Sequence, residues 1–320
     1  MTRLRCAILD DYFNLALSVA DWPKIADRVD VTVFDQPFAS EKTAADALGG
    51  FEIICAMRER TPFPRGLFAA LPKLKFLLTS GMRNAAIDME AASEHKVVVC
   101  GTQYGRDPTA ALTMGLILEL TRGIGRENAR MHLGEPWQSF AGIEIEGRTL
   151  GVVGLGKLGS RVATLAKAFG MNVIAWSPNL TPEKCKEAGV GYASKEELFA
   201  TADIITIHVV LSPRSRGLVG RNDLARMKPS AYLVNTARGP IVDEAALLEA
   251  LQQKKIAGAG IDVFSVEPLP VDHPFRNLDN LVLTPHLGYA TQEGLRTHYG
   301  QMVECIDAWT KGGEPPRKLV

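Results

Sequence analysis

The sequence predicts an α/β protein of two domains, each built on a doubly wound parallel sheet. Its 320 residues are more than one hydrophobic core usually serves, so two domains are expected. Short β-rich apolar runs alternate with helical patterns along the chain, which is typical of parallel sheets covered by helices. The alternation restarts near residue 149, and the last helix is expected to return to the first domain. We therefore assign residues 1–102 and 290–320 to one discontinuous domain and residues 103–289 to an inserted one.

The first hundred residues contain five apolar runs that we interpret as strands. They lie at 5–9, 31–34, 52–55, 76–78 and 97–99. Helical patterns separate them, for example at 44–48 and 66–71. A long helical segment is expected from about 108 to 130, because apolar residues recur there at intervals of three and four.

The second domain has the better-marked sheet. Its first strand is expected at 149–153 and its first helix at 158–169. Further strands are expected at 172–176, 204–208, 232–234, 260–263 and 281–283. The final helix of the chain is expected at about 291–309.

The composition is that of a cytoplasmic globular protein. The 36 Lys and Arg residues balance 36 Asp and Glu, which argues against a nucleic-acid surface or a polybasic membrane anchor. No apolar run reaches the roughly 18 residues of a membrane span, and the first residues, MTRLRCAILDD, lack a signal-peptide profile. The five scattered cysteines indicate reduced thiols, without a disulfide framework or a metal site.

The clearest motif is the glycine-rich turn GLGKLG, which begins at Gly154 between the strand at 149–153 and the following helix. In this context the motif predicts the phosphate-binding turn of a Rossmann dinucleotide domain. Gly154 permits the tight turn, Gly156 lets the backbone approach a pyrophosphate, and Gly159 lets the helix pack on the strand. The N–H groups at the start of the helix favour the bound anion.

The residue about 20 positions beyond this turn indicates which dinucleotide is bound. Domains that prefer NAD usually place Asp or Glu there, whereas here Ser177 follows the strand. A serine does not repel a 2′-phosphate, but no arginine follows it, and only Asn179, Thr181 and Lys184 are near. A loop that contacts little fits this pattern equally well. NAD and NADP both stay open, with a slight preference for NADP.

Polar side chains stand beyond the ends of three later strands. Arg238, Glu267 and His286 follow the strands at 232–234, 260–263 and 281–283. The carboxyl ends of parallel strands face the ligand crevice, so all three can reach one substrate. Hydride transfer to a 2-keto acid needs a cation that binds the carboxylate and a proton donor for the carbonyl oxygen. An acidic side chain beside the proton donor would hold it in place and favour its protonated form. Taken singly, each residue has an equally good alternative interpretation. Arg238 could form a surface salt bridge, Glu267 could be a turn residue, and His286 could be a core histidine.

The runs NTARGPIVDEAAL, GAGIDVFSVEPLP and TPHLGYAT closely resemble signature segments of the D-isomer-specific 2-hydroxyacid dehydrogenases, in the same order. The resemblance implies a Rossmann domain inserted into a flavodoxin-like substrate domain, in an NAD(P)-dependent oxidoreductase of small 2-keto or 2-hydroxy acids. It assigns Arg238, Glu267 and His286 as the catalytic residues. The cofactor contacts that it implies are Gly154, Gly156, Lys157, Leu158, Gly159, Ser177, His208, Val209, Thr236, Ala237, Asp262 and Gly288. Among these, Asp262 matches the acid that positions the nicotinamide carboxamide.

The resemblance extends to the substrate side of the first domain. Arg60 lies in a segment that resembles the family's active-site loop, and Met82 and Arg83 lie in one whose backbone amides bind the substrate carboxylate. Three residues depart from the family pattern. The family usually has glycine at the position of Arg83, a small residue at Tyr289 and glutamate at Ala111. The bulk of Arg83 and Tyr289 favours a small keto acid such as glyoxylate or hydroxypyruvate. Arg60 and Arg83 also suit a second acidic group, and an exposed, uninvolved Arg83 is an equal alternative.

Two rival functions share this fold. Formate dehydrogenases carry Gln where Glu267 stands, so Glu267 argues against them. Dinucleotide-sensing transcriptional corepressors are a second alternative, which the complete catalytic trio disfavours. The chain ends at Val320, which favours a short enzyme over a long, regulated phosphoglycerate dehydrogenase.

The resemblance also implies a homodimer joined through the second domain. The segment 127–143 carries Met131, Trp137 and Phe140 just before the first strand of that domain, and exposed apolar groups of this kind suggest a partner surface. An arm that folds back on its own chain is the alternative.

Overall fold

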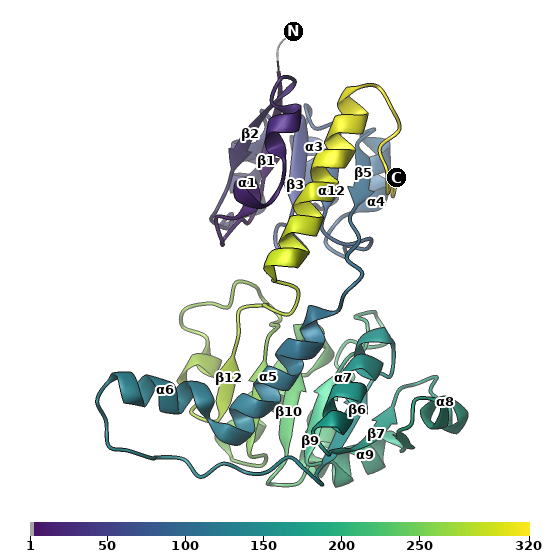
Figure 1. Ribbon diagram of the computed structural model, residues 1–320. Coiled ribbons are helices and arrows are strands. Elements are labelled where there is room, and N and C mark those ends of the chain that lie inside the picture. The colour runs from purple at the N-terminus through teal and green to yellow at the C-terminus, as the bar shows by residue number, and fades with distance from the viewer. Residues whose placement is uncertain (1–2) are drawn as a thin grey trace. The chain divides into compact units, whose positions relative to one another are not determined.

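The computed structural model describes residues 3–320, which form two compact units (Figure 1). Unit 1 combines the residues up to Arg106 with Ala290–Val320, and unit 2 is Asp107–Tyr289. Each unit has one parallel sheet, of five strands in unit 1 and seven in unit 2. The predicted fold class, two α/β units with doubly wound parallel sheets, is confirmed.

The sheet of unit 1 has the strand order β2-β1-β3-β4-β5. The strands are β1 Leu4–Ile8, β2 Val29–Val33, β3 Ile53–Ala56, β4 Phe76–Thr79 and β5 Val98–Gly101. The helices are α1 Ala16–Val19, the 3₁₀ helix η1 Trp22–Ile25, α2 Glu41–Leu48, α3 Arg65–Ala70, α4 Met89–Glu94 and α12 Gln292–Thr310.

Both faces of this sheet are buried, as a parallel sheet requires. Leu77 and Val99 point to one face and pack in a core with Leu48 of α2 and Phe68 of α3. On β4, the neighbouring Phe76 points to the other face, where its ring stacks on Trp309 of α12 with centroids 5.0 Å apart. The alternation of side chains along each strand therefore gives the sheet two apolar surfaces.

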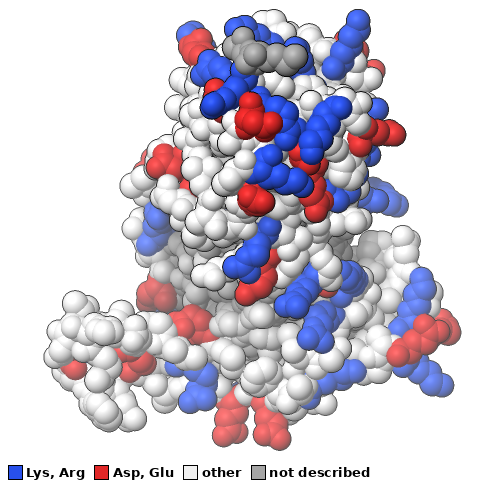
Figure 2. Space-filling view, turned by 45° about the horizontal axis from the view of Figure 1, so that its top comes forward, with Lys and Arg blue, Asp and Glu red and all other residues white. Residues whose placement is uncertain are grey.

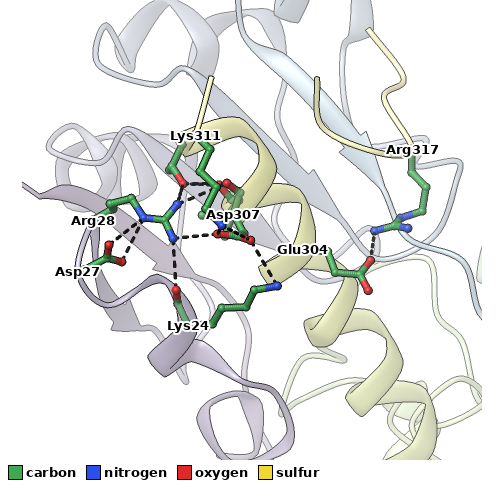
Figure 3. A network of polar contacts seen from close by, with 9 residues as sticks. Lys24, Asp27, Arg28, Glu304, Asp307, Lys311 and Arg317 are labelled. Atoms are coloured by element: carbon green, nitrogen blue, oxygen red, sulfur yellow. Dashed lines mark hydrogen bonds and ion pairs between the residues drawn. The ribbon is translucent and has the colours of Figure 1, made fainter. Parts of the chain in front are cut away.

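An ion-pair network anchors α12 to the beginning of the chain (Figure 3). The Asp307 carboxylate accepts hydrogen bonds from Lys311 Nζ at 3.0 Å and Arg28 Nη2 at 2.8 Å, and Lys24 lies 3.3 Å away. Hydrogen bonds from Lys311 and then Arg28 hold the pKa of Asp307 well below its usual value. The network joins residues far apart in sequence within unit 1.

The sheet of unit 2 has the strand order β12-β11-β10-β9-β6-β7-β8. The strands are β6 Thr149–Val153, β7 Asn172–Trp176, β8 Gly191–Tyr192, β9 Ile204–Ile207, β10 Tyr232–Asn235, β11 Gly258–Ile261 and β12 Leu281–Leu283. The helices are α5 Pro108–Arg122, α6 Ile124–His132, α7 Lys157–Ala168, α8 Pro182–Glu187, α9 Lys195–Thr201, α10 Arg221–Arg226 and α11 Glu244–Gln252, with 3₁₀ helices η2 Gly239–Ile241 and η3 Pro274–Asn277.

The helical segment expected at 108–130 is helical in the structure, but it is divided into two helices. Gly123 separates α5 from α6 and adopts a left-handed conformation, with φ 60°. Its N–H donates to Glu119 O at 2.7 Å, which caps α5 as glycines commonly do. The residues of α6 after Ile124 are mostly polar and none of them is buried, unlike those of α5.

The surface of the described chain carries mixed charge. Figure 2 shows basic and acidic side chains interspersed on the face in view, consistent with the balanced composition. Among the described residues, no helix combines the length and the apolar character needed to span a membrane. All five cysteines lie within residues 3–320 as buried free thiols.

Candidate active site

The glycine-rich turn connects β6 to α7 and has the geometry of a phosphate cradle. Gly154 has a φ of 101°, which favours glycine. A Cβ on Gly159 would lie 2.0 Å from Gly154 O, so only glycine lets the helix approach the turn this closely. A Cβ on Gly156 would meet nothing within 4 Å, and α7 starts at Lys157 without a side-chain cap. The open space before uncapped N–H groups fits a pyrophosphate.

His208 and Val209, two predicted cofactor residues, follow β9 and lie against this turn. A Cβ on Gly154 would lie 2.8 Å from both the His208 carbonyl carbon and Val209 Cγ1. Desolvation lowers the pKa of His208 to about 4, so its ring is neutral, and its Nε2 lies 2.9 Å from Thr206 Oγ1. His208 Nδ1 is buried and has no hydrogen-bond partner among residues 3–320, which leaves a polar atom for a ligand.

Ser177 lies directly after β7, next to the same turn. Gly154 N donates to Trp176 O at 2.8 Å, which links the end of β7 to the cradle. Thr181 caps α8 by accepting from Lys184 N at 3.4 Å, so its hydroxyl already has a structural role. Ser177 is half-buried and Asn179 is exposed.

The centre of the candidate site is a histidine–glutamate pair. His286 Nδ1 lies 2.6 Å from Glu267 Oε2, and the other carboxylate oxygen accepts from Phe264 N at 2.9 Å. Burial alone would raise the pKa of Glu267, but the hydrogen bond and charge of His286, with Phe264 and Arg238, lower it. Glu267 is therefore a carboxylate that holds the imidazole through Nδ1. His286 Nε2 has no hydrogen-bond partner among the described residues.

Arg238 belongs to the same cluster, because its charge contributes to the lowered pKa of Glu267. Asn235 shapes its loop: the side chain accepts from Ala237 N at 3.0 Å and donates to Arg238 O at 3.0 Å. Arg238 Nη1 donates to Ala237 O at 2.7 Å. A Cβ on Gly239 would lie 2.1 Å from the Phe264 carbonyl carbon, so glycine lets this loop pack against the one that leads to Glu267.

Asp262 fixes the loop that carries His286. Its fully buried carboxylate accepts from Thr284 Oγ1 at 2.6 Å, Leu287 N at 2.7 Å and Gly288 N at 2.9 Å. His286 has a φ of 53°, which is uncommon for a non-glycine residue, and donates its N–H to Asp262 O at 2.8 Å. Such conformations persist where the surroundings over-determine them, and they cluster at functional sites. Asp262 therefore has a positioning role that its sequence context did not reveal.

Three other predicted residues have clear places in unit 2. Thr236 is buried, with its hydroxyl 3.0 Å from Thr113 Oγ1. Tyr289 sets the edge of its ring against His286, with centroids 5.7 Å apart and an interplanar angle of 87°. Ala111 is exposed on α5.

The substrate-side residues of unit 1 lie on two loops. Arg60 packs over the Tyr12 ring at 4.6 Å, and its Nη1 donates to Asp10 O at 3.3 Å. Met82 is half-buried and Arg83 is exposed. The N–H groups of Met82 and Arg83 donate to no acceptor within residues 3–320, and successive N–H groups of this kind form an anion-binding concavity.

The described residues contain no group of three or more His, Cys, Asp or Glu side chains that could hold a metal ion.

Similarity to known proteins agrees with this arrangement. Residues 114–288 match the family model "D-isomer specific 2-hydroxyacid dehydrogenase, NAD binding domain". The chain belongs to the D-isomer-specific 2-hydroxyacid dehydrogenase family. The resemblance predicted from the signature segments is thereby confirmed.

Relatives within the family differ in length. A D-3-phosphoglycerate dehydrogenase of Methanocaldococcus jannaschii is 42% identical over 263 residues, which are 81% of this chain and 50% of that protein. The chain thus spans about half the length of that relative. A glyoxylate reductase of Aeropyrum pernix is 34% identical over 327 residues, 99% of this chain and 96% of that protein. The crystal structure of a phosphoglycerate oxidoreductase from Vibrio cholerae has a TM-score of 0.92 and 32% identity, covering 97% of this chain and all of that one.

The sequence analysis gave Asp262 only a cofactor contact and did not single out Asn235. The acceptor role of Asp262 and the bridging role of Asn235 depend on backbone groups of loops that only the fold brings near. A polar residue at the last position of an apolar strand, as Asn235 is in β10, is the signal that was available for the second.

Proposed function

We propose that this chain reduces a small 2-keto acid to the D-2-hydroxy acid with a nicotinamide dinucleotide. The observation that carries the proposal is His286, held through Nδ1 by Glu267 at 2.6 Å, with Nε2 left for substrate and Arg238 in the same cluster. The glycine turn beside β6 fits the dinucleotide. A full-length relative named glyoxylate reductase supports a substrate of this size.

The residues of the cluster divide the chemistry between them. The glycine turn that begins at Gly154 would hold the dinucleotide, and its dihydronicotinamide would supply the hydride for the keto carbon. His286 Nε2 gives its proton to the carbonyl oxygen, so the product gains one hydride and one proton. Glu267 stabilises the imidazolium that delivers this proton. The planar guanidinium of Arg238 binds carboxylate and carbonyl oxygens together.

The substrate side favours a small acid, such as glyoxylate or hydroxypyruvate. Tyr289 packs on His286 and narrows the space beside the imidazole. The N–H groups of Met82 and Arg83 donate to no described acceptor, which supports a role in binding one carboxylate. Arg60 and the exposed Arg83 also suit a second acidic group, which makes phosphorylated and dicarboxylic keto acids necessary members of any substrate panel.

The decisive experiment is a matrix of NADH and NADPH against short keto acids, with kcat/KM for each pair. Rapid oxidation of either dinucleotide with glyoxylate or hydroxypyruvate is the expected result. Dinucleotide binding without turnover of any keto acid would instead support a corepressor-like scaffold. A best substrate with a bulky side chain would contradict the small pocket.

We expect the enzyme to accept NADPH at least as readily as NADH, because Ser177 carries no charge that would repel the 2′-phosphate. Ser177→Asp should shift the kcat/KM ratio towards NADH by about 100-fold, since like charges in contact cost several kcal/mol. Ser177→Asn is the matched control, because it has the shape of aspartate without the charge. A strict NADH preference in the unaltered chain would contradict this assignment.

We also propose a homodimer that forms through the segment 124–143, which contains α6 and is called the arm below. Figure 1 shows this arm extending sideways from the sheet of unit 2. Met131, Leu133 and Trp137 are 56%, 74% and 74% exposed. Phe140 instead packs within the arm, with Arg126 over its ring at 4.2 Å. The arm thus folds partly on itself and still presents apolar side chains that suit a partner copy.

Light scattering at micromolar concentration should give the mass of a dimer. Trp137→Asp should shift that mass towards a monomer, because a charge at the centre of an apolar interface is costly to desolvate. Val271→Ser, at another exposed apolar residue of unit 2, should leave the mass unchanged. A monomeric mass for the unaltered chain would exclude the dimer at this concentration.

A further inference from the structure

We propose that Thr102 and His298 form a buried positioning pair that orients the loop 80–84 of unit 1 and so sets the affinity for the keto acid. The inference rests on the proposed function, in which this loop binds the substrate carboxylate. Neither residue is catalytic, because both act through the backbone of Gly81.

A hydrogen-bond chain runs from helix α12 to the loop. Thr102 Oγ1 accepts the Gly81 N–H at 3.0 Å and lies 2.6 Å from His298 Nδ1. The other acceptor near this hydroxyl, Thr79 O, is 3.4 Å away. A threonine hydroxyl has a single proton, and in this pair we assign it to the shorter contact, with Nδ1 as the acceptor. His298 must then carry its own proton on Nε2.

The environment keeps His298 in the neutral form that this chain requires. Burial, followed by the charge of Arg58, lowers the pKa of His298 to about 4. His298 is 5% exposed and Thr102 is fully buried, so water does not compete for their bond. One helical turn later, Gln301 accepts from Gln103 N at 2.7 Å and donates to Gln103 O at 2.9 Å. The rigid helix α12 therefore holds residues 102 and 103 with two side chains.

The consequence for the loop follows from the conformation of Gly81. Its φ is 100°, and its N–H points inward to Thr102, whereas the next two N–H groups, of Met82 and Arg83, donate to no described acceptor. A Cβ on Gly101 would lie 2.7 Å from Gly81 O, so the loop is pressed onto the end of β5. Fixing Gly81 thus fixes the direction in which the carboxylate-binding N–H groups point.

The first test compares Thr102→Val with Thr102→Ser in the full chain. The valine keeps the shape but loses the hydroxyl, and loss of one ordinary hydrogen bond corresponds to about tenfold in affinity. KM for the keto acid should therefore rise about tenfold, with kcat within about threefold and dinucleotide affinity unchanged. Thr102→Ser should stay near the unaltered values. The control is Thr121→Val, because this buried hydroxyl donates to Ile117 O of its own helix.

His298 offers a second pair of variants. His298→Asn places an amide oxygen close to the position of Nδ1 and should retain most of the affinity. His298→Leu removes the acceptor and should raise KM about as much as Thr102→Val. Because the two residues act in one chain, the double variant should raise KM no more than either single variant.

Two measurements keep the proposal testable without turnover. Amide exchange at Gly81 should accelerate about tenfold in Thr102→Val and stay unchanged in Thr102→Ser. In the unaltered protein, nitrogen NMR of His298 should show the Nε2–H tautomer. Unchanged KM and exchange in a folded Thr102→Val protein, or a proton on Nδ1, would overturn the pair. Failure of the proposed function would differ, since the unaltered chain would then reduce no keto acid at all.

Discussion

Replacing His286 with alanine is expected to lower kcat for keto-acid reduction by roughly 10²- to 10⁴-fold, the usual contribution of general acid–base catalysis. The physical reason lies in the pair with Glu267, which holds the imidazole through Nδ1 at 2.6 Å and leaves Nε2 for the proton transfer that we propose. Without the ring, the developing alkoxide must take its proton from water. Steady-state kinetics with saturating dinucleotide measures the effect.

The chain offers a matched control for this variant. His273 Nε2 lies 3.2 Å from Glu244 Oε1, so it is a second histidine–glutamate pair in the same unit, with no part in the proposed chemistry. His273→Ala should leave kcat within about twofold. Near-normal turnover in a folded His286→Ala protein would remove His286 from the mechanism, and an equal loss in both variants would indicate a structural effect.

Features carried by a single strand and the turn that follows it were predictable from the sequence. The glycine turn at Gly154 was recognisable because backbone sterics at Gly154 and Gly159 admit no other residue. Arg238, Glu267 and His286 were candidates because each follows a strand end, and parallel strands bring such ends to one edge of a sheet. The resemblance of the three signature segments to the family then assigned them as the catalytic residues. The structure places these three residues together in unit 2.

Features that depend on distant partners were not predictable. The carboxylate of Asp262 bonds Thr284, Leu287 and Gly288, more than 20 positions away in sequence, and nothing in its own neighbourhood indicates these contacts. The same holds for His298 and Thr102, which are 196 positions apart. Two-residue β8 was also missed, since so short a strand has no periodicity to detect.

Arg238 should be the second most sensitive position, even to a change that keeps its charge. Arg238→Lys replaces a planar fork, which can hold two oxygens, with a single ammonium group. Hydrogen bonds to charged groups contribute about 1.5–3 kcal/mol each, so losing one corresponds to roughly 10- to 100-fold in affinity. KM for the keto acid should therefore rise by about that factor.

Dinucleotide affinity separates this role from the alternatives. The loop of Arg238 is shaped by Asn235, which bonds the backbone of Ala237 and Arg238, so the lysine variant should keep the loop in place. Fluorescence titration should then give an unchanged Kd for the dinucleotide. Arg226→Lys is the control, because that arginine also donates to a backbone carbonyl, Asn222 O at 2.9 Å, on an exposed helix. A weakened dinucleotide Kd with unchanged KM for the keto acid would make Arg238 a cofactor residue, because the guanidinium would then contact the dinucleotide and not the substrate carboxylate.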